Sequence, residues 1–311
     1  MKKETMGPWM VTMAAILWAV DAPFRKYLTG ELSSTAIVFM EHILIAILVL
    51  PIFLPRIKEL KNLSQREWWS VIFIGFGGSA LATVLFTQSF YYLNPTVAIL
   101  LQKLQPLIAI LLAFTILGEG LSKNFWKWAI VAIFGAYIIS FPGLKPEGLA
   151  FDANMLGVIL ALGAAFFWGG STVFGRFVLD KVSFQMMTSL RFLSALVFLF
   201  LMNIYYKTLP QLSQASGKDW FFVFMTAVIA GFVSLMIYYY GLRSTKASIA
   251  TLCELAFPFA AVIVNWIFLG ATLVPMQIVG GVILLFAITR LSIVNETDIS
   301  EKAVEAEART V

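Results

Sequence analysis

Charged residues are scarce in this chain: Asp, Glu, Lys and Arg make up 13% of its 311 residues. A soluble domain carries about 25% charged residues, so the composition excludes an ordinary soluble fold. Hydrophobic residues account for 60% of the chain, and the mean hydropathy is +0.88. Long apolar runs recur from end to end, without the short alternating segments of a membrane β-barrel. The composition therefore predicts an all-α membrane protein.

Residues that bind metals or form disulfides are also rare. The one cysteine, Cys253, lies in an apolar run and has no partner for an internal disulfide. A single histidine, His42, and the lack of HExxH and CxxC motifs argue against zinc, and there is no Walker motif for ATP. We predict no metal and no cofactor. The net charge of +5 lies mainly in loops, which indicates membrane topology and not nucleic-acid binding.

Ten apolar segments of about 20 residues are each long enough to cross a ~30 Å hydrocarbon core. The first follows Lys2 and Lys3 as a signal peptide would, but it is too long and has no cleavage site, so we expect it to be retained. Beyond the last segment, residues 295–311 form a polar tail. The predicted spans are 8–28, 35–54, 68–91, 95–117, 124–142, 153–178, 183–206, 219–242, 246–269 and 273–293.

The loop charges orient these spans. If the N-terminus is cytoplasmic, fifteen basic residues lie inside and five outside, a clear positive-inside bias. Both termini and the tail are then cytoplasmic. The five outside residues are Arg25, Lys26, Lys145, Lys207 and Lys218.

One apolar segment occurs twice, about 152 residues apart. Val97–Leu121 aligns with Ile249–Leu273. Two copies of five spans are the usual architecture of a secondary transporter, with the site between the copies. Because five is odd, the second copy must be inverted. We place the copies at 8–142 and 153–293. The matched positions are Ala98 and Ala250, Pro106 and Pro258, Leu117-Gly118 and Leu269-Gly270, and Leu121 and Leu273.

With Trp18 and Trp168 in the first span of each copy and Arg191 early in the seventh span, this doubled pattern resembles the EamA group of the drug/metabolite transporter superfamily. The resemblance covers roughly residues 8–293. It implies ten helices, inverted repeats, and alternating access to a central cavity lined by spans one to four and six to nine. Members carry amino acids, other metabolites or drugs. The sequence departs from the pattern at Ala271, which stands where a glutamate matching Glu119 is expected.

Charged residues inside spans cost roughly 2.5–3.5 kcal/mol each on insertion scales, so they face a cavity or a partner. Three of them lie outward of their span centres and two lie inward, as inverted symmetry requires. The functional interpretation is that these two layers bind substrate or form alternating gates. The alternative is structural ion pairing of Lys103 with Glu41 or Asp21 and of Arg191 with Glu254. The outward set is Asp21, Glu41 and Lys103, and the inward set is Arg191 and Glu254.

Prolines interrupt both fourth spans. Pro106 removes the amide that would bond to the carbonyl of Gln102, and Pro258 frees that of Glu254. Such carbonyls are tolerated only beside protein or a wet cavity. Both prolines are therefore predicted hinges, with a kink used only for packing as the alternative.

Aromatic residues cluster at residues 90–92 and 238–240, where they serve an interfacial belt or a gate. Trp18 and Trp168 lie deeper, for packing or binding. We name Glu254, Glu41 and His42 as candidates for proton coupling, although adjacent helix residues point about 100° apart. The predicted substrate-binding residues are Trp18, Asp21, Gln88, Tyr91, Gln102, Lys103, Gln105, Trp168, Ser171, Arg191, Tyr238 and Glu254.

The leading hypothesis is a secondary-active transporter of a small polar metabolite, such as an amino acid or related zwitterion, in a prokaryotic inner membrane. An organic anion or a cationic drug-like compound is the alternative substrate. An intramembrane lipid-modifying enzyme is the alternative of another class, but no catalytic cluster stands out and we predict no enzyme. The expected partners are the substrate, membrane lipid and protons, without nucleic acid. A homodimer is left open.

Overall fold

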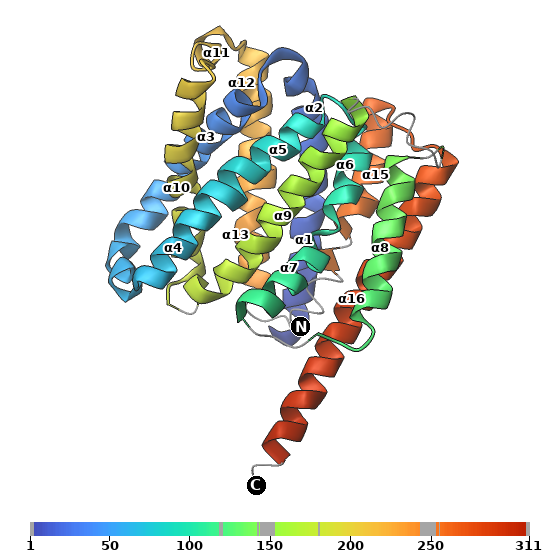
Figure 1. The fold of residues 1–311 in the computed structure, drawn as a ribbon. Helices are drawn as coiled ribbons and strands as arrows, with labels where there is room; N and C mark the ends of the chain where they lie inside the picture. Colours follow the sequence, from blue (N-terminus) through green and yellow to red (C-terminus); the bar gives the residue numbers. More distant parts are fainter. Residues whose placement is uncertain are drawn as a thin grey trace.

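The computed structural model describes residues 3–117, 121–141, 143, 153–179, 181–242, 253–254 and 256–308. Helices make up nearly all of these residues, and no strand occurs among them (Figure 1). Six of the described helical segments are long and apolar enough to cross a membrane: Ser34–Asn62, Gln65–Ser89, Pro95–Ile116, Ala153–Gly175, Phe184–Tyr205 and Gly217–Gly241. Three shorter apolar helices are Phe125–Ser140, Ala256–Leu269 and Pro275–Leu291. The chain is an integral membrane protein, and the count of ten spans stays a prediction.

The first predicted span is not one continuous helix. It consists of α1 (Lys3–Ala19) and α2 (Asp21–Glu31), with a turn at Val20. Pro23 has no backbone amide and leaves the carbonyl of Ala19 without its helical partner, which explains the break. The break places Trp18 and Asp21 on either side of a junction inside the bundle.

The rest of the first copy alternates regular and distorted helix. A 3₁₀ segment extends the second span, and π-helix occurs in the third and fourth spans. The elements are α3 (Ser34–Phe53), η1 (Leu54–Asn62), α4 (Gln65–Phe73), η2 (Ile74–Leu81), α5 (Ala82–Ser89), α6 (Pro95–Gln102), α7 (Gln105–Leu112), η3 (Ala113–Leu117) and α8 (Phe125–Ser140).

The second copy follows a similar order, but its first span is the single unbroken helix α9 (Ala153–Leu179). Its last helix runs beyond the predicted span and projects from the bundle in Figure 1, so the polar tail continues as helix as far as Ala308. The elements are α9 (Ala153–Leu179), α10 (Phe184–Tyr205), α11 (Gln211–Gln214), α12 (Gly217–Met225), η4 (Thr226–Val233), α13 (Ser234–Leu242), α15 (Ala256–Leu269) and α16 (Pro275–Ala308).

The two copies share local structure at the spacing seen in the sequence. A capping box begins each third span, formed by Ser64 and Glu67 at α4 and by Ser216 and Asp219 at α12. Each helix then becomes π-helical, in η2 and η4, again 152 residues apart. The repeat therefore extends to irregular backbone, which is common at functional sites.

Loops of one copy cap helices of the other. Ser183, the N-cap of α10, donates to Glu59 of η1 from its amide (2.6 Å) and its hydroxyl (3.0 Å). Ser33, the N-cap of α3, donates to Gln211 of α11 from the same two groups, both at 2.9 Å. These equivalent caps hold the ends of α3 and α10 together, at opposite ends of the bundle (Figure 1).

The packing of the helices follows the same symmetry. Pairs of equivalent helices pack together, α8 with α16 and α3 with α10. The helix α1 packs on α13 and α15, as its equivalent α9 packs on α5 and α7. Close approach of α8 and α16 depends on Gly135 and Gly280, because a Cβ at either would lie within 3.0 Å of the other helix's backbone.

Candidate functional site

One group of buried charges lies where α2, α3 and α5 meet. Arg25 Nε lies 2.6 Å from Asp21 Oδ2, and its Nη2 lies 3.0 Å from Glu41 Oε1. Arg25 Nη1 donates to Thr87 Oγ1 at 2.6 Å. Arg25 and Glu41 are only 6% and 4% exposed. We call Asp21, Arg25, Glu41 and Thr87 the Arg25 cluster. Asp21 and Glu41 thus pair with Arg25, where the sequence offered Lys103 as their structural partner.

Lys103 lies instead at the break between α6 and α7. Its amide bonds to Leu100 O at 3.0 Å, a tight turn that ends α6 one residue earlier. The side chain is 6% exposed, and Nζ lies 4.8 Å from the centre of the Phe257 ring. Within the described part of the chain, no carboxylate is in salt-bridge contact with this ammonium. A buried cation is thus held chiefly by an aromatic face, a cation–π contact.

Aromatic rings connect Lys103 to Glu254. The Trp18 ring lies 6.2 Å from Phe257 and 5.2 Å from Tyr238. Tyr238 Oη donates to Glu254 Oε1 at 2.6 Å. Lys103 and Glu254 interact electrostatically without direct contact. We call Trp18, Lys103, Tyr238, Glu254 and Phe257 the Lys103 cluster. It brings together four predicted site residues from both copies of the repeat.

Arg191 occupies a third position, against η2. Its Nη2 donates to Gly78 O at 3.1 Å, while the buried Nε has no hydrogen-bond partner among the described residues. Ser171 Oγ is likewise buried without a described partner. A Cβ on Gly78 would overlap the Ser171 side chain, so glycine is required for this close approach. The ion pair of Arg191 with Glu254 that the sequence allowed is not found in the described residues.

Glu41 and His42 point to different neighbours, as their adjacency on a helix requires. His42 Nδ1 donates to Val38 O at 2.8 Å, and Nε2 lies 3.1 Å from Ser79 Oγ of η2. The imidazole packs against Phe192 of α10, with ring centres 5.4 Å apart. Both ring nitrogens of His42 therefore contact groups other than Glu41 in this structure.

The predicted glutamines bridge the broken fourth span to α9. Gln102 Nε2 donates to Gln105 Oε1 at 3.3 Å, and Gln105 Nε2 donates to Thr172 Oγ1 at 3.5 Å. The buried Gln102 Oε1 has no described partner. The fourth span, which carries Lys103, thus also carries a glutamine whose amide oxygen can accept a further hydrogen bond.

Other predicted residues lie apart from the Lys103 cluster. Gln88 accepts from Ser34 at 2.6 Å, and Tyr91 Oη donates to Leu32 O at 2.5 Å, so both tie the third span to the α2–α3 connection. Trp168 packs on Phe86, with ring centres 5.2 Å apart.

The structure describes the surroundings of the first predicted hinge more fully than those of the second. Pro106 is the second residue of α7, directly after the Lys103-Leu104 turn, so the fourth span is interrupted where the sequence indicated. Pro258 is the third residue of α15. Residues 243–252 and Leu255 lie outside the described residues, as does Glu119.

Sequence reasoning missed several neutral residues. Thr87 and Phe257 complete the two clusters, and the buried Asn265 donates to Thr96 Oγ1 at 3.0 Å, which joins α15 to α6. For two of these residues the sequence holds a signal, because Phe257 directly precedes the span-breaking Pro258 and Asn265 lies two turns after it. Nothing in the sequence around Thr87 distinguishes it.

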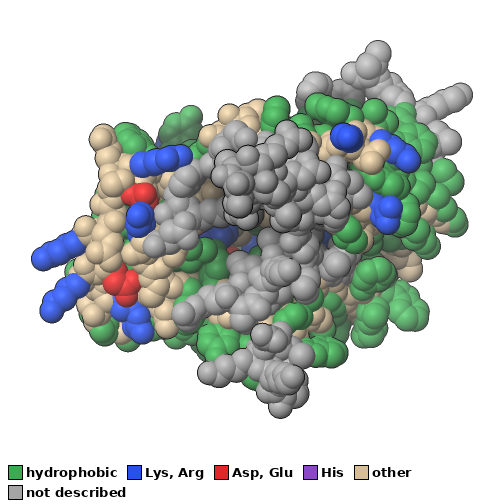
Figure 2. Space-filling view, turned by 90° about the horizontal axis from the view of Figure 1, so that it is seen from below, with side chains coloured by type: hydrophobic (Ala, Val, Ile, Leu, Met, Phe, Trp, Pro, Cys, Tyr) green, Lys and Arg blue, Asp and Glu red, His purple; other side chains and the backbone are tan. Residues whose placement is uncertain are grey.

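Basic side chains surround the end of the bundle where α1 begins. Figure 2 shows this end hollowed between the helices, with blue Lys and Arg side chains along the rim and inside the hollow. The exposed basic residues of the described segments here are Lys58, Lys61, Arg66, Lys123, Lys127, Lys181 and Arg290.

A membrane-embedded bundle of two related copies, with charged and aromatic residues held between them, has the architecture of a membrane transporter. The sequence matches the EamA-like transporter family twice, over residues 5–141 and 155–293. The chain therefore belongs to the EamA-like transporter family, and it is a transporter and not an enzyme.

Individual relatives agree with this assignment. The "Riboflavin transporter ImpX" of Fusobacterium nucleatum is 29% identical over 95% of this chain and 100% of that protein. The "Uncharacterized transporter YvbV" of Bacillus subtilis is 22% identical over 96% of this chain and 95% of its own. A solved crystal structure shares the fold with a TM-score of 0.60 at 16% identity, covering 94% of this chain and 98% of that one.

Proposed function

We propose that this protein is a secondary-active transporter that moves a small molecule by alternating access and binds it at the Lys103 cluster. The observation that carries this proposal is the buried ammonium of Lys103, which lies between the two copies beside an aromatic ring and out of contact with any described carboxylate. An ammonium has three donors, so Lys103 can hold a polar group of the substrate.

The same proposal assigns the copies as inverted repeats at 8–142 and 153–293, within ten spans and with both termini cytoplasmic. The odd number of spans per copy and the twofold pattern of helix pairs support inversion. The basic rim in Figure 2 supports a cytoplasmic assignment for that end. Bacterial relatives favour the inner membrane. In a Cys253→Ser background, Lys61→Cys should label only from the cytoplasm and Ser213→Cys of α11 only from outside. Labelling of Lys61→Cys in intact cells would reverse the orientation.

For the substrate we propose a flavin such as riboflavin. The relative that is 29% identical over its full length carries that name. The cluster offers what a planar heteroaromatic ring needs, namely the rings of Trp18, Tyr238 and Phe257 for stacking. Lys103 supplies donors for ring carbonyls, the buried Gln102 Oε1 can accept from a ring N–H, and the glutamines can bind a polyol chain.

A zwitterion such as an amino acid is the second candidate, because Lys103 and Glu254 place opposite charges in one cluster. An organic anion would use Lys103 and Arg191, and a cationic compound would use Glu254. These alternatives predict different competitors in a single experiment.

Purified protein in liposomes should take up labelled riboflavin, and excess unlabelled flavin should abolish the uptake. A mixture of amino acids at the same excess should leave it unchanged. Liposomes without protein and liposomes with Lys103→Met protein serve as controls. Uptake of amino acids without uptake of riboflavin would reject the flavin and support the zwitterion. No flux of either class would reject both substrates.

We further propose that Glu254 carries the coupling proton, with Glu41 as the next candidate. Glu254 accepts a hydrogen bond from Tyr238 and has no described salt bridge, so its charge is open to change. Glu41 is committed to Arg25. Pro106 and Pro258 would act as hinges, because each follows the polar residues of a fourth span that must move around the substrate.

A further inference from the structure

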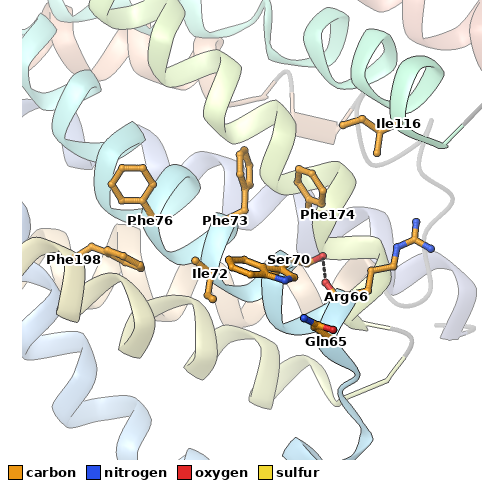
Figure 3. Close-up of a pocket in the computed structure, with 10 residues that line it drawn as sticks. Gln65, Arg66, Ser70, Ile72, Phe73, Phe76, Ile116, Phe174 and Phe198 are labelled. Carbon is orange, nitrogen blue, oxygen red and sulfur yellow. Dashed lines mark hydrogen bonds between the residues drawn. The ribbon is translucent and has the colours of Figure 1, made fainter.

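A lateral pocket lies on the side of the bundle, away from the Lys103 cluster (Figure 3). Its volume is about 880 Å³, in the range of about 300–1,000 Å³ typical of ligand pockets. The first turns of α4 and the π-helix η2 form one wall, and α9 and α10 contribute Phe174 and Phe198 to the other. Exposed Phe76 (40%) and Trp69 (64%) show that it opens to the outside of the bundle, which is the lipid phase in a membrane protein.

The pocket changes from polar to apolar along its length. Gln65, Arg66 and Ser70 lie together at one end, at the start of α4, whereas Phe76 and Phe198 lie at the other (Figure 3). A compound with polar groups at one end and a long apolar chain matches this gradient. A compact ring system with polar groups around its edge does not.

The polar end carries a basic side chain. Among the described residues that line the pocket, Arg66 is the one charged residue and there is no carboxylate. The guanidinium has five donors in a planar fork that matches phosphate oxygens, so it can bind a phosphate beside its contacts within the protein.

We infer that this pocket binds an anionic phospholipid, with its phosphate at Arg66 and one acyl chain between Phe76 and Phe198. Basic pockets between membrane helices are typical sites for anionic headgroups. This inference depends on the membrane location of the protein and not on its substrate. The pocket borders the contact of Gly75 in η2 with Ser194 in α10, so a bound lipid would contact both copies.

Native mass spectrometry of the purified protein tests this site with two lipids of equal acyl chains, phosphatidylglycerol and phosphatidylcholine. The wild-type protein should retain phosphatidylglycerol preferentially. Arg66→Gln should reduce that preference about fivefold, the effect of one basic residue near a headgroup. The matched control Lys61→Gln removes a neighbouring charge outside the pocket and should keep the wild-type preference.

A second variant tests the acyl-chain part. Phe76→Gln places a polar amide at the apolar end of the pocket, at an exposed position (40%), and should reduce the retention of both lipids. The inference is overturned if Arg66→Gln keeps the wild-type preference, or if Lys61→Gln loses as much as Arg66→Gln does. It is also overturned if a photoreactive flavin crosslinks at Phe76 in competition with lipid, because the pocket would then be an entry route for substrate.

Discussion

Arg25 and Lys103 are two buried cations of one transporter, stabilised in opposite ways. Arg25 contacts two carboxylates and a hydroxyl, and all of them belong to the first copy. Lys103 contacts an aromatic ring of the second copy and lies near a carboxylate it does not touch. A cation whose partners are complete within one copy stabilises that copy. A cation between the copies with unused donors is suited to bind a ligand whose position changes as the copies move.

The largest effect is expected from breaking the Arg25 cluster. Arg25→Met leaves Asp21 and Glu41 buried without their cation and should lower the free energy of unfolding by about 3–5 kcal/mol. The matched variant Lys103→Met removes a cation that has no salt bridge among the described residues and should leave stability unchanged or raise it. Thermal unfolding in detergent measures both. Equal losses of stability would remove the distinction between the clusters.

Transport should show the reverse order. At matched protein levels, Lys103→Met should lower kcat/KM about 10- to 150-fold, because a hydrogen bond to a charged group contributes about 1.5–3 kcal/mol. Lys127→Met, at an exposed lysine over Trp128, should transport normally. Wild-type flux from Lys103→Met would exclude the Lys103 cluster as the binding site.

The two carboxylates extend the comparison to coupling. Glu254→Gln should keep substrate exchange but lose accumulation driven by a pH gradient, because an amide carries no exchangeable charge. Glu41→Gln should reduce stability while any folded protein keeps its pH-driven accumulation, since Glu41 serves Arg25. Accumulation that survives in Glu254→Gln and fails in Glu41→Gln would move the coupling role to Glu41.

The sequence predicted the features of the fold that depend on hydrophobicity and on repetition. Apolar runs and the matched prolines revealed a helical membrane protein of two copies, and family membership confirmed it. The break at Val20 was missed although Pro23 signals it, because the apolar run continues across the break. The π-helices were missed because π and α helix have similar apolar patterns.

The candidate site was predictable as a set of residues but not as a set of contacts. Depth along a span can be counted, so Lys103 and Glu254 were both found. Which charges pair depends on helix rotation and on the path of the backbone at breaks. The contact of Arg25 with Asp21 follows from their spacing of one helical turn, whereas its contact with Glu41 of α3 depends on how the two helices are placed and rotated.

The smallest effect should come from a single hydroxyl. Tyr238→Phe keeps the ring against Trp18 but removes the 2.6 Å hydrogen bond to Glu254. The carboxylate is only half-buried and can take water instead, so the loss should stay near the lower end for a charged hydrogen bond, about tenfold in KM. Tyr240→Phe is the matched control, because Tyr240 is 51% exposed and packs on Phe184 outside the cluster. Stability should not change in either variant. If Tyr238→Phe lowers stability but leaves KM unchanged, then the Tyr238–Glu254 bond serves packing as the Arg25 cluster does, and Lys103 would have to bind the substrate without Glu254.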